Sequence, residues 1–249
     1  MAGPDAASYL QRMLSNDVEA LDLGEACDAL LLTAKARVVA TTTVWRRGDD
    51  DFLLLTEPEL GERLLGELRR FRFAAKATIE PEQHVSTLVV GPETPVGGIS
   101  NSDYGTPAFE LLDAEADGAE EIDAAALELL RIRARTPRFG RELDDRVLPA
   151  EAGLDERAIS FTKGCYPGQE PVARLHYRGH ANRGLRVLGL EGEQPPYDAE
   201  LSHDGAVVGR ITSSVAASDG TIVALGYVRR EVPADVELVL ADGRRVTQA

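Results

Sequence analysis

Three Asp-Gly dipeptides in the C-terminal part of the chain limit what this part can fold into. They separate short segments in which apolar and polar residues alternate: Leu185–Leu190, Ala206–Thr212, Ile222–Val228 and Val236–Leu240. The dipeptides Asp204-Gly205, Asp219-Gly220 and Asp242-Gly243 favour tight hairpin turns, because these residue types tolerate a positive φ. We therefore predict a small antiparallel β-barrel or sandwich beyond Arg183.

The preceding part of the chain mixes helical and strand patterns, so the predicted fold class is α+β. Helical spacing of apolar residues is found at Ala6–Leu14 and Ala124–Arg133, and a helix start at Thr56 leads to Arg70. Runs of β-branched and apolar residues predict strands at Ala29–Leu32, Val38–Val44, Phe52–Leu55, Phe73–Ile79 and Ser86–Val90. Loops are expected at Gly91–Gly105 and in the acidic segment Asp113–Asp123.

Composition sets wide limits on organisation and partners. The 249 residues are 43% hydrophobic and 28% charged, which allows one large or two modest domains, here predicted as 1–182 and 183–249. No segment approaches the ~20 apolar residues that span a bilayer, and the N-terminus lacks the pattern of a signal peptide. A cytoplasmic protein with no membrane partner is expected. The net charge of -15 argues against duplex nucleic acid as a partner.

The segment Lys163-Gly-Cys-Tyr-Pro-Gly-Gln-Glu170 is the most specific chemical feature of the chain. Its glycines and proline predict a shaped loop that presents Cys165, and the nearby Lys163 would favour the thiolate form. The alternative is that Cys165 is a small structural residue. Cys27, the only other cysteine, lies in an apolar run and is expected in the core. Two cysteines are too few for a disulfide scaffold or a four-cysteine metal site, so no metal is predicted.

Positive charge concentrates at and after this loop. Between residues 163 and 186 there are five Lys or Arg side chains and one acid, Glu170, and the segment also contains His176 and His180. A local positive charge in an acidic chain attracts anions, and small polycarboxylates or phosphates are the expected ligands.

Two further segments allow two interpretations each. Arg131, Arg133 and Arg135 would share one face if the chain were extended there, but would fan out into solvent if it were helical. Asn16 and Asp17 follow a predicted helix, where their short side chains are typical of a turn. If Asn16 and Asp17 only form a turn, their presence does not indicate a function.

The loop and its surroundings resemble the signature of the YgfZ family of folate-binding proteins. The resemblance rests on KGCYPGQE, on VARLHYRG after it and on LPAEAGLDERAISFT before it. It extends along nearly the whole chain through YLQRMLSNDV, ALLLTAKARVVATTTV and RIRARTPRFG. This family is related to the aminomethyltransferase, or T-protein, of the glycine cleavage system, and its mitochondrial members act in iron-sulfur cluster assembly.

The resemblance implies an aminomethyltransferase-like folate-binding fold with a C-terminal antiparallel β-barrel, and tetrahydrofolate as the cofactor. Implied partners are reduced folate and iron-sulfur proteins or their assembly factors, with tRNA involved only indirectly. The implied catalytic residues are Cys165, Lys163 and Glu170. The implied cofactor-binding residues are Asn16, Asp17, Arg131, Arg133, Tyr166, Gln169 and Arg174.

Two departures from the related aminomethyltransferases bear on the activity. Arg133 stands where those enzymes carry an acidic residue, and Arg135-Thr136 replaces the usual small residue or glycine before Pro137. The chain could still be a true aminomethyltransferase that moves a one-carbon unit to tetrahydrofolate. It could also be a scaffold protein with a vestigial folate pocket.

Overall fold

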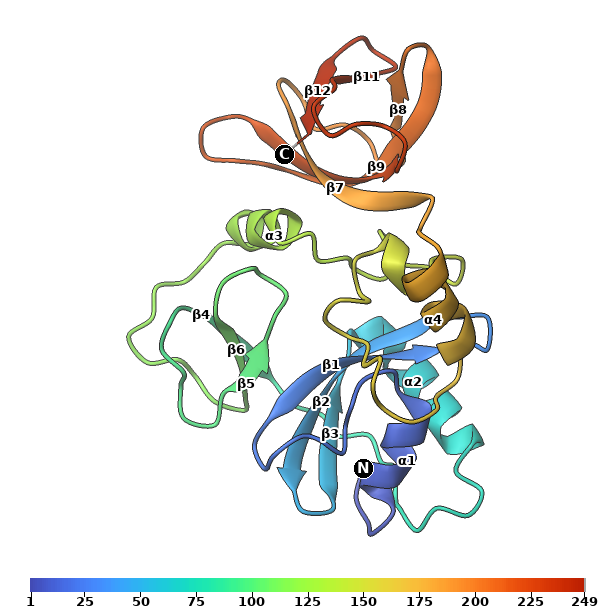
Figure 1. The fold of residues 1–249 in the computed structure, drawn as a ribbon. Helices are drawn as coiled ribbons and strands as arrows, with labels where there is room; N and C mark the ends of the chain where they lie inside the picture. The colour runs from blue at the N-terminus through green and yellow to red at the C-terminus, as the bar shows by residue number, and fades with distance from the viewer. Residues whose placement is uncertain (249) are drawn as a thin grey trace.

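The structure is a computed structural model that describes residues 1–248, and it contains two small antiparallel sheets, helices packed against them, and a closed β-barrel (Figure 1). The first part comprises α1 (Ala6–Met13), β1 (Ala26–Leu32), β2 (Val38–Gly48), β3 (Asp51–Leu55), the 3-10 helix η1 (Pro58–Leu60) and α2 (Gly61–Arg70). The second comprises β4 (Ser86–Val90), β5 (Ile99–Asn101) and β6 (Ala108–Leu112), followed by α3 (Ala124–Arg133), the 3-10 helix η2 (Pro149–Glu151) and α4 (Gln169–Arg178). The barrel comprises β7 (Arg183–Leu190), β8 (Glu200–His203), β9 (Ala206–Ala216), β10 (Ile222–Arg229), β11 (Leu238–Leu240) and β12 (Arg245–Gln248).

The sheet β1-β2-β3 is packed on both faces, because successive side chains of a strand point to opposite sides. Leu31 belongs to a core formed with α1 and α2, whereas its neighbours Leu30 and Leu32 belong to a second core. The first core also contains Tyr9, whose hydroxyl donates to the main-chain oxygen of Leu68 at 2.5 Å. Strand β1 is therefore buried on both faces, by the first core on one side and by the second core on the other.

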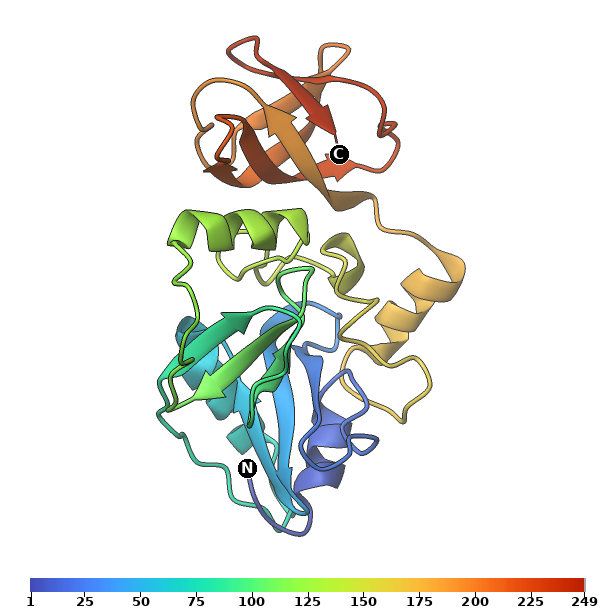
Figure 2. The ribbon, with the colours of Figure 1, turned by 90° about the vertical axis from the view of Figure 1, so that its left-hand side faces the viewer.

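The second sheet has the strand order β4-β6-β5 and leads through the acidic segment into α3. The side chain of Asp123 caps α3 by accepting a hydrogen bond from the Ala126 amide at 2.7 Å. Figure 2 shows α3 directly beneath the barrel, between it and the two sheets. The second core joins these parts, because Ile132 of α3 packs in one cluster with Leu225 and Tyr227 of β10.

The barrel confirms the predicted C-terminal architecture and the α+β class. Its strands close in the order β10-β7-β12-β11-β8-β9. Asp204-Gly205 forms the β8-β9 turn with φ values of 49° and 76°, as a two-residue hairpin requires. The dipeptides Asp219-Gly220 and Asp242-Gly243 lie between β9 and β10 and between β11 and β12.

The strand prediction at Phe73–Ile79 is wrong. Phe73 is 91% exposed, and Ala77 and Ile79 are buried in the first core without forming a strand. The only regular pairing in this segment, within the described chain, is an isolated bridge between Thr78 and Ala2. Conversely, β5 lies inside the predicted loop Gly91–Gly105, and β6, β8, β12 and α4 lie outside the elements expected from the sequence. None of the helices in residues 1–248 has the length and apolar character required to cross a membrane.

Candidate functional site

A cavity of about 1150 Å³ lies between the β1-β2-β3 sheet, helix α2 and the β4-β6-β5 sheet. Strand β3 and helix α2 supply an apolar wall of Leu53, Leu54, Leu55, Leu64, Leu65 and Leu68. Polar groups come from β1, β2 and the segments around residues 100–103 and 157. Small-molecule sites are typically about 300–1,000 Å³, so this cavity can hold an extended organic ligand.

Arg157 is the only arginine or lysine side chain lining this cavity within residues 1–248. Its Nη2 donates to Asp103 Oδ1 at 2.9 Å and its Nη1 donates to Ser102 Oγ at 3.1 Å. Its Nε lies 3.9 Å from Asp28 Oδ2. Burial raises the pKa of Asp103, and the charge of Arg157 opposes this shift. Arg157 therefore links strand β1 to the loop that follows β5.

Four half-buried carboxylates face the cavity, and we call them the inner carboxylates: Asp28, Glu57, Asp103 and Glu110. Glu110 accepts hydrogen bonds from Asn101 Nδ2 at 2.9 Å and from the Ser86 hydroxyl. Glu57 accepts one from the Phe139 amide at 3.1 Å, and burial raises its pKa. No group of three or more His, Cys, Asp or Glu side chains in residues 1–248 is arranged to hold a metal ion.

The signature loop lies outside the lining of this cavity, since none of residues 163–170 is among the lining residues. Cys165 is exposed, whereas Lys163 and Tyr166 are 8% and 7% exposed. The Lys163 ammonium lies 5.4 Å from the centre of the Tyr166 ring. The loop therefore presents its thiol outward and its amine inward.

The Lys163 ammonium is committed to main-chain carbonyls. It donates to the oxygens of Gln11, Leu14 and Asn16 at 2.6, 2.7 and 2.7 Å, which uses all three of its protons. Burial lowers the pKa of Lys163 to about 8, while the charge of Asp17 opposes the shift, so the amine remains protonated at neutral pH. No proton is left for a hydrogen bond to Cys165.

The turn that Lys163 holds is itself bonded to the cavity wall. Asn16 Nδ2 donates to the main-chain oxygens of Asp28 at 2.7 Å and Arg157 at 3.3 Å. The Ser15 hydroxyl donates to the Ala158 oxygen at 2.6 Å. Asp28, Arg157 and Ala158 all line the cavity. The signature loop and the cavity are thus connected through residues 14–16.

Asp17 has a local role in this turn. Its Oδ1 accepts a hydrogen bond from Gln11 Nε2 at 2.8 Å, and its amide donates to Asn16 Oδ1 at 2.9 Å. Neither Asn16 nor Asp17 lines the cavity. The turn interpretation therefore accounts for the contacts of both side chains.

Helix α4 begins within the signature segment, directly after a position that must be glycine. Gly168 has φ 83°, and a Cβ atom there would lie 2.6 Å from the main-chain oxygen of Thr33. Gln169 is the first residue of the helix. Glu170 and Arg174 form an exposed pair at 2.8 Å one turn apart, so these two predicted site residues bind each other.

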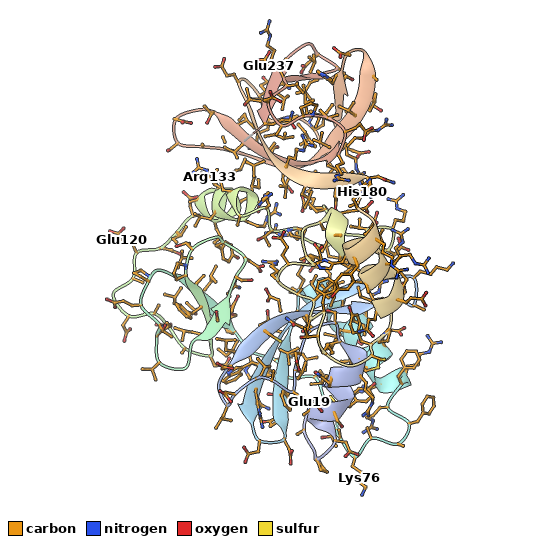
Figure 3. All side chains as sticks on the ribbon, in the orientation of Figure 1. Glu19, Lys76, Glu120, Arg133, His180 and Glu237 are labelled. Carbon is orange, nitrogen blue, oxygen red and sulfur yellow. The ribbon has the colours of Figure 1, made fainter. Side chains whose placement is uncertain are left out.

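The structure does not bring Arg131 or Arg133 to the cavity. Their segment is helical. Side chains two positions apart share a face only in an extended strand, so these arginines do not lie on one face. Arg131 is 3% exposed and pairs with Glu128 at 2.6 Å and Glu142 at 3.2 Å. Arg133 is exposed on α3 and faces the barrel side in Figure 3. The solvated interpretation holds for Arg133, and Arg131 is part of a buried ion network.

Two of the five Lys or Arg side chains of the positive segment, Arg174 and Arg183, pair with carboxylates in the fold. Arg183 pairs with Glu151 at 3.2 Å, and Arg186 donates to the Val232 oxygen at 2.8 Å. Within residues 1–248, Arg178 has no carboxylate partner. The anion site that this segment predicted is therefore not a cluster of free cations.

Sequence reasoning missed the residues that line the cavity. Arg157 lies in the LDER sequence before the signature loop, and Asp103 lies in a segment predicted only as a loop. No single segment carries this signal, because Asp28, Asp103 and Arg157 meet only in the fold. A charged run such as Asp155-Glu156-Arg157 is also the usual pattern of a solvated surface.

Comparisons with known proteins agree with this architecture. The chain is 25% identical to the tRNA-modifying protein YgfZ of Yersinia pestis over 280 aligned positions, covering 97% of this chain and 84% of that protein. It is 28% identical to the protein of the same name from Edwardsiella ictaluri, with coverages of 98% and 86%. An uncharacterized protein of Haemophilus influenzae is 27% identical, with coverages of 86% and 79%. No protein-family model matches the chain.

The fold also matches a solved structure. The glycine cleavage system aminomethyltransferase T from Bartonella henselae superposes with a TM-score of 0.83 at 19% identity, covering 99% of this chain and 81% of that chain. The aminomethyltransferase-like fold expected from the sequence is therefore confirmed.

Proposed function

Starting from a chain that resembles the YgfZ proteins along nearly its whole length and has the aminomethyltransferase fold, we propose that it binds a reduced folate in the central cavity. We further propose that it supports the assembly or repair of iron-sulfur enzymes in the cytoplasm, directly or through tRNA modification. The observation that carries the folate proposal is the cavity itself, with an apolar wall, inner carboxylates and a single arginine.

The cavity has the groups that a tetrahydrofolate needs. The 2-amino and ring N–H groups of a pterin are paired donors, which match a carboxylate such as Asp103 or Glu110. The aminobenzoyl ring is apolar and suits the leucine wall of β3 and α2. Arg157, whose guanidinium already binds Asp103 and Ser102, would hold Asp103 in position for the pterin. Tetrahydrofolate, when bound, would carry a one-carbon unit on its nitrogens.

Cys165 is the proposed reactive atom, and its exposure favours action on a partner at the surface. Candidate partners are iron-sulfur proteins or their assembly factors. Lys163 would serve by holding the loop, since its ammonium is bound to three carbonyls. Glu170 and Arg174, paired on the exposed face of α4, would contribute to the same surface.

Calorimetry with 5-formyltetrahydrofolate tests the folate site. Arg157→Gln should weaken binding about 10- to 100-fold, since a hydrogen bond to a charged group contributes about 1.5–3 kcal/mol. Leu65→Trp should obstruct the apolar wall independently of charge. Arg133→Gln is the matched control and should bind normally, because Arg133 is exposed and does not line the cavity. Absence of binding by the unmodified protein, or equal binding by all variants, would contradict the proposal.

A true aminomethyltransferase remains the second candidate, favoured by the fold match. An assay with a lipoyl carrier protein that bears the aminomethyl group separates the two functions, since only an aminomethyltransferase would transfer its carbon to tetrahydrofolate, forming methylenetetrahydrofolate and releasing ammonia. Complementation of a strain in which the gene is deleted measures the iron-sulfur role. Cys165→Ala should retain folate binding and fail to restore iron-sulfur enzyme activity.

A further inference from the structure

A second cavity lies between the end of helix α4, the 3-10 helix η2 and the β1-β2 hairpin, and we call it the α4 pocket. Its lining includes Leu148, Asp155, Val172, Leu175, His176 and His180. Its volume is about 240 Å³, just below the range of about 300–1,000 Å³ that is typical of small-molecule sites. Among residues 1–248 it shares no lining residue with the central cavity, so a ligand in the α4 pocket leaves the folate site free.

Much of the lining of the α4 pocket is apolar. Pro149 and Val172 are buried, and Leu148 and Leu175 are half-buried. Val172 belongs to the second core and Leu148 packs against it, which holds these side chains in place. The pocket can therefore cover a short aliphatic or cyclic hydrocarbon group, whose burial is favourable.

Asp155 supplies a negative charge to the pocket. Its side chain is half-buried, and it is the only carboxylate of the lining in the part of the chain that the structure describes. Within the same residues its carboxylate has no hydrogen-bond donor and no ion-pair partner. Partial burial of an uncompensated carboxylate is unfavourable, so a cationic group beside Asp155 would stabilise it.

The nearby cations do not compensate Asp155. The lining contains no Arg or Lys side chain among residues 1–248. Arg37 donates to a main-chain oxygen, and Arg183 pairs with a carboxylate of its own. Lys35 and Arg178 are exposed and lie outside the lining. The compensating cation is therefore left for a ligand to supply.

The C-terminal end of α4 adds acceptors and partial negative charge. Leu175 and His176 from the last turn of the helix, and Gly179 and His180 after it, line the pocket. The last carbonyls of a helix lack helical partners, and the helix dipole places about half a negative charge there. His180 lies at this end, below the barrel (Figure 3), and a neutral imidazole has one nitrogen that accepts a hydrogen bond. These groups favour a cation that donates hydrogen bonds.

We propose that the α4 pocket binds a small organic amine in its cationic form. The ammonium lies beside Asp155 and the end of α4, and the hydrocarbon part packs against Leu148 and Val172. A primary ammonium has three protons, for which the carboxylate, the helical carbonyls and the imidazoles are acceptors. This site is independent of the proposed folate site.

The test is an NMR titration of the isotope-labelled full-length protein with three cyclohexane derivatives of similar size. Cyclohexylamine is a cation, cyclohexanol is neutral and cyclohexanecarboxylate is an anion at pH 8, where histidine side chains are generally neutral. The amine should bind about tenfold more tightly than the other two compounds. It should also shift the ring resonances of His176 and His180, which locates it in the α4 pocket.

Four variants assign the binding to this pocket. Asp155→Asn keeps the side-chain shape and should weaken amine binding about tenfold, since a hydrogen bond to a charged group is lost. Ala150→Phe should obstruct the pocket for all three compounds. The matched control Glu156→Gln removes an adjacent exposed charge outside the lining and should leave the amine affinity unchanged. Leu65→Trp, which obstructs the central cavity, should also leave it unchanged.

Several outcomes would overturn the amine site. They are binding of none of the three compounds, equal affinities for amine and alcohol, tighter binding of the carboxylate, and equal effects of Asp155→Asn and Glu156→Gln. Loss of amine binding in Leu65→Trp would place the amine in the central cavity and would also overturn the proposal. None of these results bears on folate affinity, which calorimetry measures separately. Thermal melting verifies that each variant is folded, and if Ala150→Phe is not, Asp155→Asn decides alone.

Discussion

The side-chain ammonium of Lys163 lies 2.7 Å from the main-chain oxygen of Asn16, a residue 147 positions earlier in the chain. The same ammonium binds the carbonyl of Gln11 in the last turn of α1, where helical carbonyls lack partners. The lysine of the signature loop thus fixes the end of a distant helix. The turn at residues 14–16, which Lys163 binds, also forms hydrogen bonds to the cavity residues Asp28 and Arg157.

Lys163→Met should lower the free energy of unfolding by about 3 kcal/mol, because three buried or half-buried carbonyls lose their donor. Chemical denaturation followed by circular dichroism measures this change. Lys35→Met is the control, since Lys35 is exposed, and it should change stability by less than about 0.5 kcal/mol. Equal effects of the two substitutions would contradict the assigned role of Lys163.

The two cysteines should differ in reactivity toward iodoacetamide. Burial raises the pKa of Cys27 to about 12, so its thiol should stay protonated and inert at neutral pH. Cys165 is exposed and should be labelled first. Mass spectrometry of the digested protein measures labelling at each site, and protein unfolded in urea provides the control in which both react. Faster labelling of Cys27 in the native protein would refute this prediction.

Glu57 should make stability depend on pH in the acid range. Burial raises its pKa, so the folded state binds this proton more tightly than the unfolded state. The stabilisation is therefore present at low pH and is lost as pH rises through the folded pKa. Glu57→Gln stays neutral and can still accept from the Phe139 amide, so it should raise the melting temperature at pH 7 more than at pH 4. Glu59→Gln, at an exposed position, should show no such difference.

Gly168→Ala should destabilise the protein by at least about 2 kcal/mol. A left-handed conformation costs a residue with a Cβ about 1–2 kcal/mol, and here the Cβ would also clash with the Thr33 oxygen. Gly164→Ala in the same loop is the matched control, because a Cβ there meets nothing within 4 Å. Thermal unfolding of both variants checks the difference, and similar melting temperatures would exclude a steric requirement at Gly168.

Local signals predicted the elements whose formation depends on neighbouring residues. Helix α3 begins and ends at the predicted residues, Ala124 and Arg133, because a capping aspartate precedes an uninterrupted helical pattern. The hairpins of the barrel follow from their Asp-Gly turns. The strands β8 and β12 were missed because they are short, with four residues each, and gain their partners from the closed barrel. The division at residues 182 and 183 stays a prediction.

The candidate site was less predictable, because its contacts join distant segments. The spacing of Lys163 and Cys165 indicated an electrostatic pair, but carbonyls from residues 11–16 bind the amine. Arg157 acquires its partners from β1 and from the loop after β5. The catalytic and cofactor roles assigned by resemblance stay predictions.

The second core has a consequence for truncated forms of the protein. Tyr227 of the barrel donates to the Glu142 main-chain oxygen at 3.0 Å, and Ser213 donates to the Glu142 carboxylate at 2.7 Å. A chain ending at residue 182 would lose both donors and would expose Ile132 and other apolar side chains that the barrel now covers. Such a fragment should aggregate on expression. We therefore expect the barrel and the remainder to fold as one unit, although their topologies are separate.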